Sequence, residues 1–303
     1  MLGRDLLAAL AAHPRLAATA ATRAEVDITD PDAVRAAVAG HDVVINAAAW
    51  TDVDGAERDE DAATAVNGTA VGHLARACAV MGARLLQIST DYVFPGTGRR
   101  PYPEDAPTAP VNAYGRGKLA GEQAVTRHLP DAGYIVRTAW LYAPHGRSFV
   151  GTMLRLAAER DHLEVVNDQT GQPTSAAALA GLLIRLAEAA LAGRAAPGIY
   201  HGTAAGQASW YDLARAAFAL RGLDPDRIRP VSSDRFPRPA RRPGYSVLGH
   251  DRWAAAGLRP LPDWRTGLAA VLSPASIPAP AGSTAGSTAG SVGAEGAPAG
   301  TGA

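Results

Sequence analysis

The sequence predicts an α/β protein with a doubly wound parallel sheet and a smaller C-terminal substrate lobe. Two observations carry this prediction. Short apolar runs alternate with helical patterns over residues 1–145, and small or hydroxyl residues follow several of the runs. Such alternation gives parallel strands joined by right-handed crossovers, with helices on both faces of the sheet. In sheets of this kind, ligands bind at the carboxyl ends of the strands.

The first part of the chain supplies the opening elements. MLGRDLLAAL predicts an amphipathic helix that begins almost at residue 1, and RLAATA at 15–20 predicts a strand. Asp30 and Pro31 together predict a helix start, since one is a preferred N-cap and the other suits the first helical position. HDVVINAAAW at 41–50 is a continuous apolar run, which predicts a strand buried on both faces.

A helical stretch follows from about residue 55 to Met81, and Gly82 ends it. ARLLQIST at 83–90 predicts the next buried strand. A helix is then predicted over 112–129 and a strand over 133–142. The alternation therefore continues to about residue 145.

The remaining chain divides into two parts. Residues 146–272 are predicted to be mainly a substrate lobe with some segments returning to the sheet, and helices are expected near 148–160, 175–192 and 209–220. Residues 273–303 are rich in Ala, Gly, Ser, Thr and Pro. Such residues bury too little surface to offset ordering entropy, so a disordered tail is expected.

Composition excludes several classes. The 303 residues carry 29 basic and 29 acidic side chains, so no single-sign field favours nucleic acid or an anionic membrane. No apolar run reaches ~18 residues, and the N-terminus lacks the form of a signal peptide. Cys78 is the lone cysteine, which excludes an internal disulfide and fits a reducing cytoplasm.

Tyr114 and Lys118 are candidate catalytic residues. Their spacing of four puts both side chains on one face of the predicted helix. An ammonium beside a phenol lowers the pKa of the phenol, and a phenol so tuned exchanges a proton with a carbonyl or alcohol. The alternative is a surface tyrosine and a solvated lysine.

The stretch QISTDYVF makes the catalytic interpretation more specific. Its strand ends at Ser89 and Thr90, so a hydroxyl lies at the edge where ligands bind. Thr90 is placed to form a hydrogen bond with the same substrate oxygen that Tyr114 protonates. Asp91 is placed to accept a hydrogen bond from a substrate hydroxyl. The alternative is that the two hydroxyls only cap a loop. After the earlier strand, the small residues of NAAAWT let a flat nucleotide approach, although they also suit ordinary strand–helix packing.

Together these motifs resemble the extended short-chain dehydrogenases/reductases, which have a Rossmann-like fold, and within them the dTDP-4-dehydrorhamnose reductase family. The resemblance covers residues 1 to about 270. It rests on DITDPDAV, DVVINAAAWTDVDGAE, ISTDYVFPGTG, NAYGRGKLAGE, VRTAWLY, VVNDQTGQPTS, GIYHGTA and RRPGYSVL.

The resemblance implies NADPH-dependent reduction of the C4 keto group of a dTDP-4-keto-6-deoxy sugar, for dTDP-rhamnose or a related deoxysugar. Tyr114 would donate the proton, and Lys118 would hold the nicotinamide ribose and tune the tyrosine. Thr90, Asp91 and Trp140 would contact the sugar. Besides Tyr114 and Lys118, the implied cofactor positions are Met1, Leu2, Gly3, Asp27, Ile28, Ala49, Trp50 and Thr51.

Arginines suit the charged parts of these ligands. Arg23 is placed to meet a 2′-phosphate and favour NADPH over NADH, although a plain surface role suits it equally. In RRPGYS, either Arg241 or Arg242 is a candidate for a diphosphate. NDQTGQPTS would form a substrate-side loop, shaped by Gly171 and Pro173.

The opening residues depart from this family pattern. A buried strand and a GxxGxxG turn should precede the first helix, and MLG matches only the last part of that turn. Gly3 would be the glycine that permits close helix–strand packing. Either the recorded start is internal or the protein begins here. We expect the 303-residue chain to bind cofactor poorly and fold marginally, and an upstream extension to restore both.

Three further expectations concern metals, assembly and class. Asp5 matches one acidic position that binds a divalent ion at a dimer contact in some relatives, but PTSAAALAGLL offers no second acid, so no metal is expected. A homodimer stays open. The alternative function is a non-catalytic nucleotide-binding regulatory subunit of the same fold, like the methionine adenosyltransferase β subunit.

Overall fold

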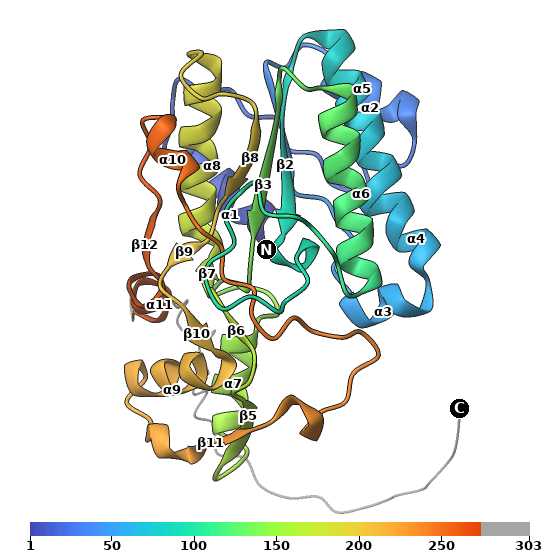
Figure 1. Cartoon of the computed structure of the whole chain (residues 1–303). Helices are drawn as coiled ribbons and strands as arrows, with labels where there is room; N and C mark the ends of the chain where they lie inside the picture. The colour runs from blue at the N-terminus through green and yellow to red at the C-terminus, as the bar shows by residue number, and fades with distance from the viewer. Residues whose placement is uncertain (274–303) are drawn as a thin grey trace, which may run out of the picture.

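The structure, a computed structural model, describes residues 1–273, so the predicted disordered tail lies outside the described residues except for Ser273. Its centre is a four-stranded parallel sheet in the order β1-β2-β3-β8 (Figure 1). The strands are β1 (Val43–Asn46), β2 (Arg84–Thr90), β3 (Gly133–Thr138) and β8 (Gly198–His201). Thr90 and Thr138 pair at the carboxyl edge, so both hydroxyls reach the same end of the sheet.

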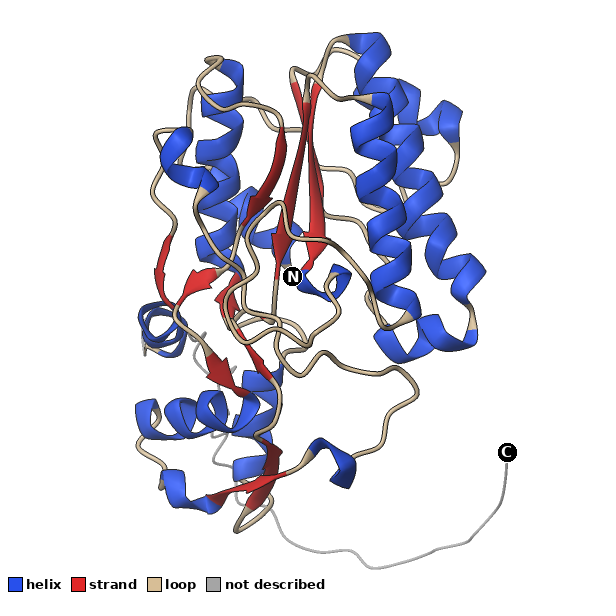
Figure 2. Ribbon diagram, viewed as in Figure 1, coloured by secondary structure: helices blue, strands red, loops and turns tan. Residues whose placement is uncertain are grey.

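Helices cover both faces of this sheet, which confirms the doubly wound prediction. One core cluster joins α1 (Leu2–Leu10) and α8 (Ala176–Leu191) to one face of the sheet. A second cluster joins α2 (Pro31–Val38), α5 (Ala70–Met81) and α6 (Ala113–His128) to the other face. Figure 2 shows these two helical layers on either side of the central strands.

Local signals explain where several helices begin and end. The Asp30 side chain accepts bonds from two backbone amides of α2, and Pro31 is its first residue, as predicted. Gly82 ends α5 in the left-handed conformation, with a φ of 72°. The predicted continuous stretch before it is interrupted, because Asp59 leaves the helical conformation, with φ −143° and ψ 70°, and its side chain caps a new helix. The segments are α3 (Val53–Arg58), α4 (Glu60–Thr64) and a π-helical turn (Ala65–Thr69).

The start of the chain corrects three predictions. Residues 15–20 form no strand and are mostly exposed. β1 is not buried on both faces, since three of its four residues are half-buried. A strand needs a neighbour for its hydrogen bonds, and within residues 1–273 β1 pairs only with β2. Gly3 permits no close packing here, because a Cβ added to it would meet nothing within 4 Å.

A small lobe lies below the carboxyl ends of the sheet (Figure 1). It contains the pairs β5 (Leu163–Val166) with β11 (Ile228–Val231) and β6 (Thr170–Gly171) with β10 (Ala208–Ser209). The helices α7 (Phe149–Ala157) and α9 (Trp210–Leu220) pack on it. The predicted helices near 148–160, 175–192 and 209–220 are thus confirmed.

The remaining elements are short. They are β4 (Leu141–Tyr142), β7 (Thr174–Ser175), β9 (Ala204–Ala205), β12 (Leu261–Asp263), α10 (Arg252–Ala255), α11 (Trp264–Leu272) and 3-10 turns at Asp91–Val93, Pro225–Arg227 and Ser233–Arg235. Across the described residues, no helix is both long and apolar enough to traverse a bilayer.

Candidate active site

The end of β2 and the start of α6 bring the predicted catalytic residues together. After Thr90 the chain turns into a 3-10 helix, and the Thr90 hydroxyl accepts from the Tyr92 amide at 3.1 Å. The same hydroxyl donates to Asp91 Oδ1 at 3.0 Å. Asn112 begins α6 by accepting from the Gly115 amide at 2.8 Å. Tyr114 therefore lies in the first turn of α6, beside the strand end.

Tyr114 is half-buried, and its ring meets the Tyr92 ring edge-on at a centroid distance of 5.9 Å. Burial, together with the Asp91 charge, raises the pKa of Tyr114 to about 12, and the Thr90 hydroxyl acts in the opposite direction. Thr90 and Asp91 thus face the phenol, as the sequence predicted. The expected lowering of the Tyr114 pKa is wrong for this structure.

Lys118 explains that difference. Its Nζ donates to the Ile88 carbonyl at 2.6 Å, so the ammonium is directed to the strand backbone. The side chain is buried, and burial lowers the pKa of Lys118 to about 8, whereas the Glu122 charge raises it. The solvated-lysine alternative is therefore excluded.

Asp91 is a second perturbed acid at this edge. It is 2% exposed, and burial raises its pKa to about 6, opposed most by the hydroxyls of Ser246 and Thr90. Within the described part of the chain, Asp91 Oδ2 is buried and no hydrogen bond reaches it, although the Ser246 hydroxyl lies near enough to lower the Asp91 pKa. An unused acceptor beside Tyr114 is suited to a ligand hydroxyl.

Sequence reasoning did not find the ion-pair cluster beneath this site, formed by Ser89, Glu122 and Arg137. Glu122 accepts from Ser89 Oγ at 2.5 Å, and from Arg137 Nε and Nη2 at 2.9 and 2.7 Å. The Arg137 and Glu122 side chains are 2% and 4% exposed. Because Ser89 precedes Thr90 and Glu122 follows Lys118 by one turn, the cluster ties β2 to α6. The signal available in the sequence was a charged residue, Arg137, within the otherwise mostly apolar strand β3.

Trp140 has an unusual conformation after β3. Its φ of 45° places a non-glycine residue in the left-handed region, which is costly. Its indole stacks on Trp210 at 3.6 Å, with 7° between the planes. A Cβ added to Gly171 would lie 2.6 Å from the same indole, so this glycine makes room for it. Gly171 thus shapes this part of the NDQTGQPTS loop.

The structure distinguishes the two candidate arginines. Arg241 is exposed, and its carbonyl accepts from Asn112 Nδ2 at 2.8 Å. Arg242 binds the Asp54 carboxylate with both Nη atoms. Its guanidinium also faces Tyr92, since each group affects the pKa of the other. Arg242, not Arg241, therefore reaches the residues around Tyr114.

The structure places the predicted cofactor residues in several different surroundings. Trp50 exchanges two 3.0 Å bonds with Asn67, and its ring packs in one cluster with Tyr114. Leu2 packs in the core cluster that contains Ile88, two residues before the end of β2. Arg23 lies near enough to Asp27 to lower its pKa, behind the larger effect of the Thr29 bonds. Ala49 and Thr51 flank Trp50 in the sequence. Ile28 packs on the α2–α5 cluster.

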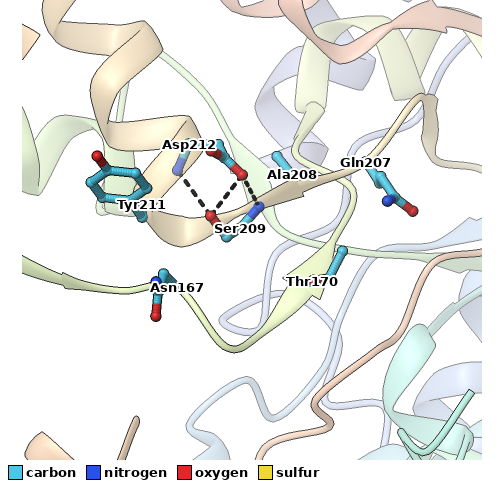
Figure 3. Close-up of a pocket in the computed structure, with 7 residues that line it drawn as sticks. All are labelled: Asn167, Thr170, Gln207, Ala208, Ser209, Tyr211 and Asp212. Atoms are coloured by element: carbon cyan, nitrogen blue, oxygen red, sulfur yellow. Dashed lines mark hydrogen bonds between the residues drawn. The ribbon is translucent and has the colours of Figure 1, made fainter. Parts of the chain in front are cut away.

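An open hollow of ≈ 290 Å³ lies in the small lobe beside the predicted substrate-side loop (Figure 3). Ser209 and Asp212 cap each other at the start of α9, and their bonds are drawn in the figure. The lining residues are Asn167, Thr170, Gln207, Ala208, Ser209, Tyr211 and Asp212. None of the residues around Tyr114 lines it.

Metal-binding side chains do not gather in the described part of the chain. Across residues 1–273, no group of three or more His, Cys, Asp or Glu side chains is arranged to hold a metal ion. Asp5 Oδ1 lies 3.0 Å from His145 Nε2, so the one acidic position considered for a metal has a side-chain partner.

A doubly wound sheet with a helical tyrosine–lysine pair beside a strand-end threonine defines the class of short-chain dehydrogenases and reductases. Comparisons narrow the class. The family model described as RmlD substrate binding domain matches residues 1–277. A dTDP-4-dehydrorhamnose reductase of Streptomyces griseus is 56% identical over 270 residues, which cover 88% of each chain.

Two further relatives support the same family. A dTDP-4-keto-6-deoxy-D-glucose reductase of Streptomyces niveus is 52% identical over 88% of this chain and 92% of its own. The crystal structure of dTDP-4-dehydrorhamnose reductase from Bacillus anthracis in complex with NADP is similar with a TM-score of 0.84 and 35% identity. It covers 89% of this chain and 94% of that one. The chain belongs to the RmlD, or dTDP-4-dehydrorhamnose reductase, family.

Proposed function

We propose that the protein uses NADPH to reduce the C4 keto group of a dTDP-4-keto-6-deoxy sugar to an alcohol. Relatives at 50–56% identity carry the names of reductases of this kind. The observation that carries the proposal is the half-buried Tyr114 phenol facing Thr90 and Asp91 at the carboxyl edge of the sheet. The product is dTDP-rhamnose or a related deoxysugar.

The residues present fit a nicotinamide cofactor at the reacting end. Lys118 is buried beside the strand end, and the Trp50 backbone is fixed by Asn67 next to Tyr114. When bound, NADPH supplies the hydride that adds to C4. The residues that would line it are Met1, Leu2, Gly3, Arg23, Asp27, Ile28, Ala49, Trp50, Thr51, Tyr114 and Lys118.

Tyr114 supplies the proton. With a pKa raised to about 12, the phenol stays protonated at neutral pH, as a donor in a reduction must. Its O–H bond breaks as the proton passes to the C4 oxygen, and the phenolate left behind then takes a proton from solvent, which restores the phenol. Thr90 contacts the same oxygen, and the free Asp91 Oδ2 accepts from a sugar hydroxyl.

The rest of the nucleotide sugar meets residues beyond the strand end. The Trp140 indole, held by Trp210 and Gly171, offers an apolar face to the sugar. Arg242 suits the diphosphate because its guanidinium stays positively charged while its two Nη atoms bind Asp54.

We also propose a cytoplasmic location. Cys78 is buried, and burial raises its pKa to about 12, so its thiol is unreactive, which is compatible with that location.

Incubation with NADPH and dTDP-4-keto-6-deoxyhexose tests the proposal. We expect reduced-nicotinamide absorbance to fall in proportion to the alcohol formed. A protein that binds dTDP but oxidises no NADPH would instead support the regulatory-subunit alternative. Light scattering tests the homodimer that the sequence leaves open.

A further inference from the structure

A strap, defined as residues 236–243, crosses from the small lobe to the sheet. It follows the 3-10 turn at Ser233–Arg235, passes below α3 and then leads back to the sheet (Figure 1). At its far end, a Cβ added to Gly96 would lie 2.4 Å from the Pro243 side chain, so the backbones approach closely there. The strap therefore passes over the loop that follows β2.

One carboxylate on α3, that of Asp54, contacts the strap at three residues. Asp54 Oδ2 accepts from Arg242 Nη2 at 3.0 Å, and Oδ1 binds Arg242 Nη1. Asp54 Oδ1 also accepts from the Ala240 amide at 3.2 Å, and Arg238 Nη1 lies 3.8 Å from Oδ2. Asp54 thus contacts three strap residues from a single position.

These contacts decide where the Arg242 guanidinium lies. The Arg242 and Asp54 side chains are each 20% exposed, so the pair is shielded from solvent more than an ordinary surface pair. Two of the N–H groups of Arg242 point to Asp54, and Nη1 also donates to the Ala240 carbonyl at 2.6 Å. The same guanidinium faces Tyr92, whose ring touches Tyr114.

We propose that Asp54 is a positioning residue that anchors the strap and holds Arg242 in place for the diphosphate of the nucleotide sugar. This inference rests on the proposed function, because that function supplies the diphosphate. Asp54 acts only through Arg242 and its neighbours in the strap. Removing its charge therefore weakens diphosphate binding without changing the residues around the nicotinamide.

The test is a double-mutant cycle with dTDP as the probe, measured by calorimetry on the full chain. We expect D54N to weaken dTDP binding about tenfold or more, since charge-assisted bonds are lost. R242Q should weaken it at least as much, and D54N/R242Q should match R242Q alone. NADPH affinity should change by less than about twofold in D54N, which a general loss of fold would not allow.

E60Q is the matched control. Glu60 forms a two-bond pair with Arg116, but the side chains are 43% and 46% exposed, so this pair contributes little. E60Q should leave dTDP affinity within about twofold of the wild type. A D54N affinity within the same range, or an effect that adds fully to that of R242Q, overturns the inference.

Trypsin supplies an independent readout. Cleavage between Arg241 and Arg242 should be faster in D54N than in the wild type and E60Q, because the anchored strap resists the protease. If the wild type fails to bind dTDP, the proposed substrate class is wrong. The trypsin comparison then decides the inference alone: equal cleavage of D54N and wild type overturns the anchor.

Discussion

Replacing Arg137 by methionine probes the ion-pair cluster that ties β2 to α6. The substitution removes both Arg137 bonds to Glu122 and leaves that carboxylate, 4% exposed, with the Ser89 hydroxyl as its remaining bonding partner. Breaking a buried ion pair in this way costs about 3–5 kcal/mol. In a chain of this size, such a loss lowers Tm by about 10 °C.

Urea unfolding and calorimetry measure this loss. The control is Arg116→Met on α6. The pair of Arg116 with Glu60 is solvent-exposed, so this substitution should cost about 0–1 kcal/mol. The double variant R137M/E122L should recover stability relative to R137M, since the uncompensated charge is gone. If R137M loses no more stability than R116M, the reasoning about the buried cluster is wrong.

Three further predictions concern the site. Tyr114→Phe should lower kcat for NADPH oxidation about 10²–10⁴-fold with Tm unchanged; turnover equal to the wild type would contradict the proton-donor role. Because Asp91 loses its charge as pH falls through about 6, KM for the keto sugar should rise over that window, and D91N should show no such rise. Its raised folded-state pKa also means that its contribution to stability declines as pH rises from about 4 to 6. Gly171→Ala should displace the Trp140 indole, raise KM and weaken the near-ultraviolet circular dichroism of the stacked indoles; an unchanged spectrum would refute the contact.

The sequence carried the local features of this site. The four-residue spacing of Tyr114 and Lys118 predicted that both lie on one face of a helix. The alternation of strands and helices predicted that Thr90 lies at the end of a strand. These depend on the helical and strand repeats, which are properties of neighbouring residues. Helix starts were equally local, since Asp30 contacts amides within its own first turn.

Long-range contacts could not be predicted in the same way. The choice of Arg242 over Arg241 depends on Asp54, almost 190 positions away, and the Lys118 ammonium binds the carbonyl of another element. Residues 15–20 are apolar enough for a strand, but strand formation depends on an available neighbour rather than on composition.

Two sets of contacts converge on α6 and control different properties of the site. In the first set, Ser89, Glu122 and Arg137 fix the helix against the strand that carries Thr90. In the second set, Asp54 and the strap bring Arg242 to Tyr92 and so to the first turn of the same helix. The two sets share no residue. We therefore expect the first set to affect stability and the position of Tyr114, and the second set to affect how a nucleotide sugar is bound.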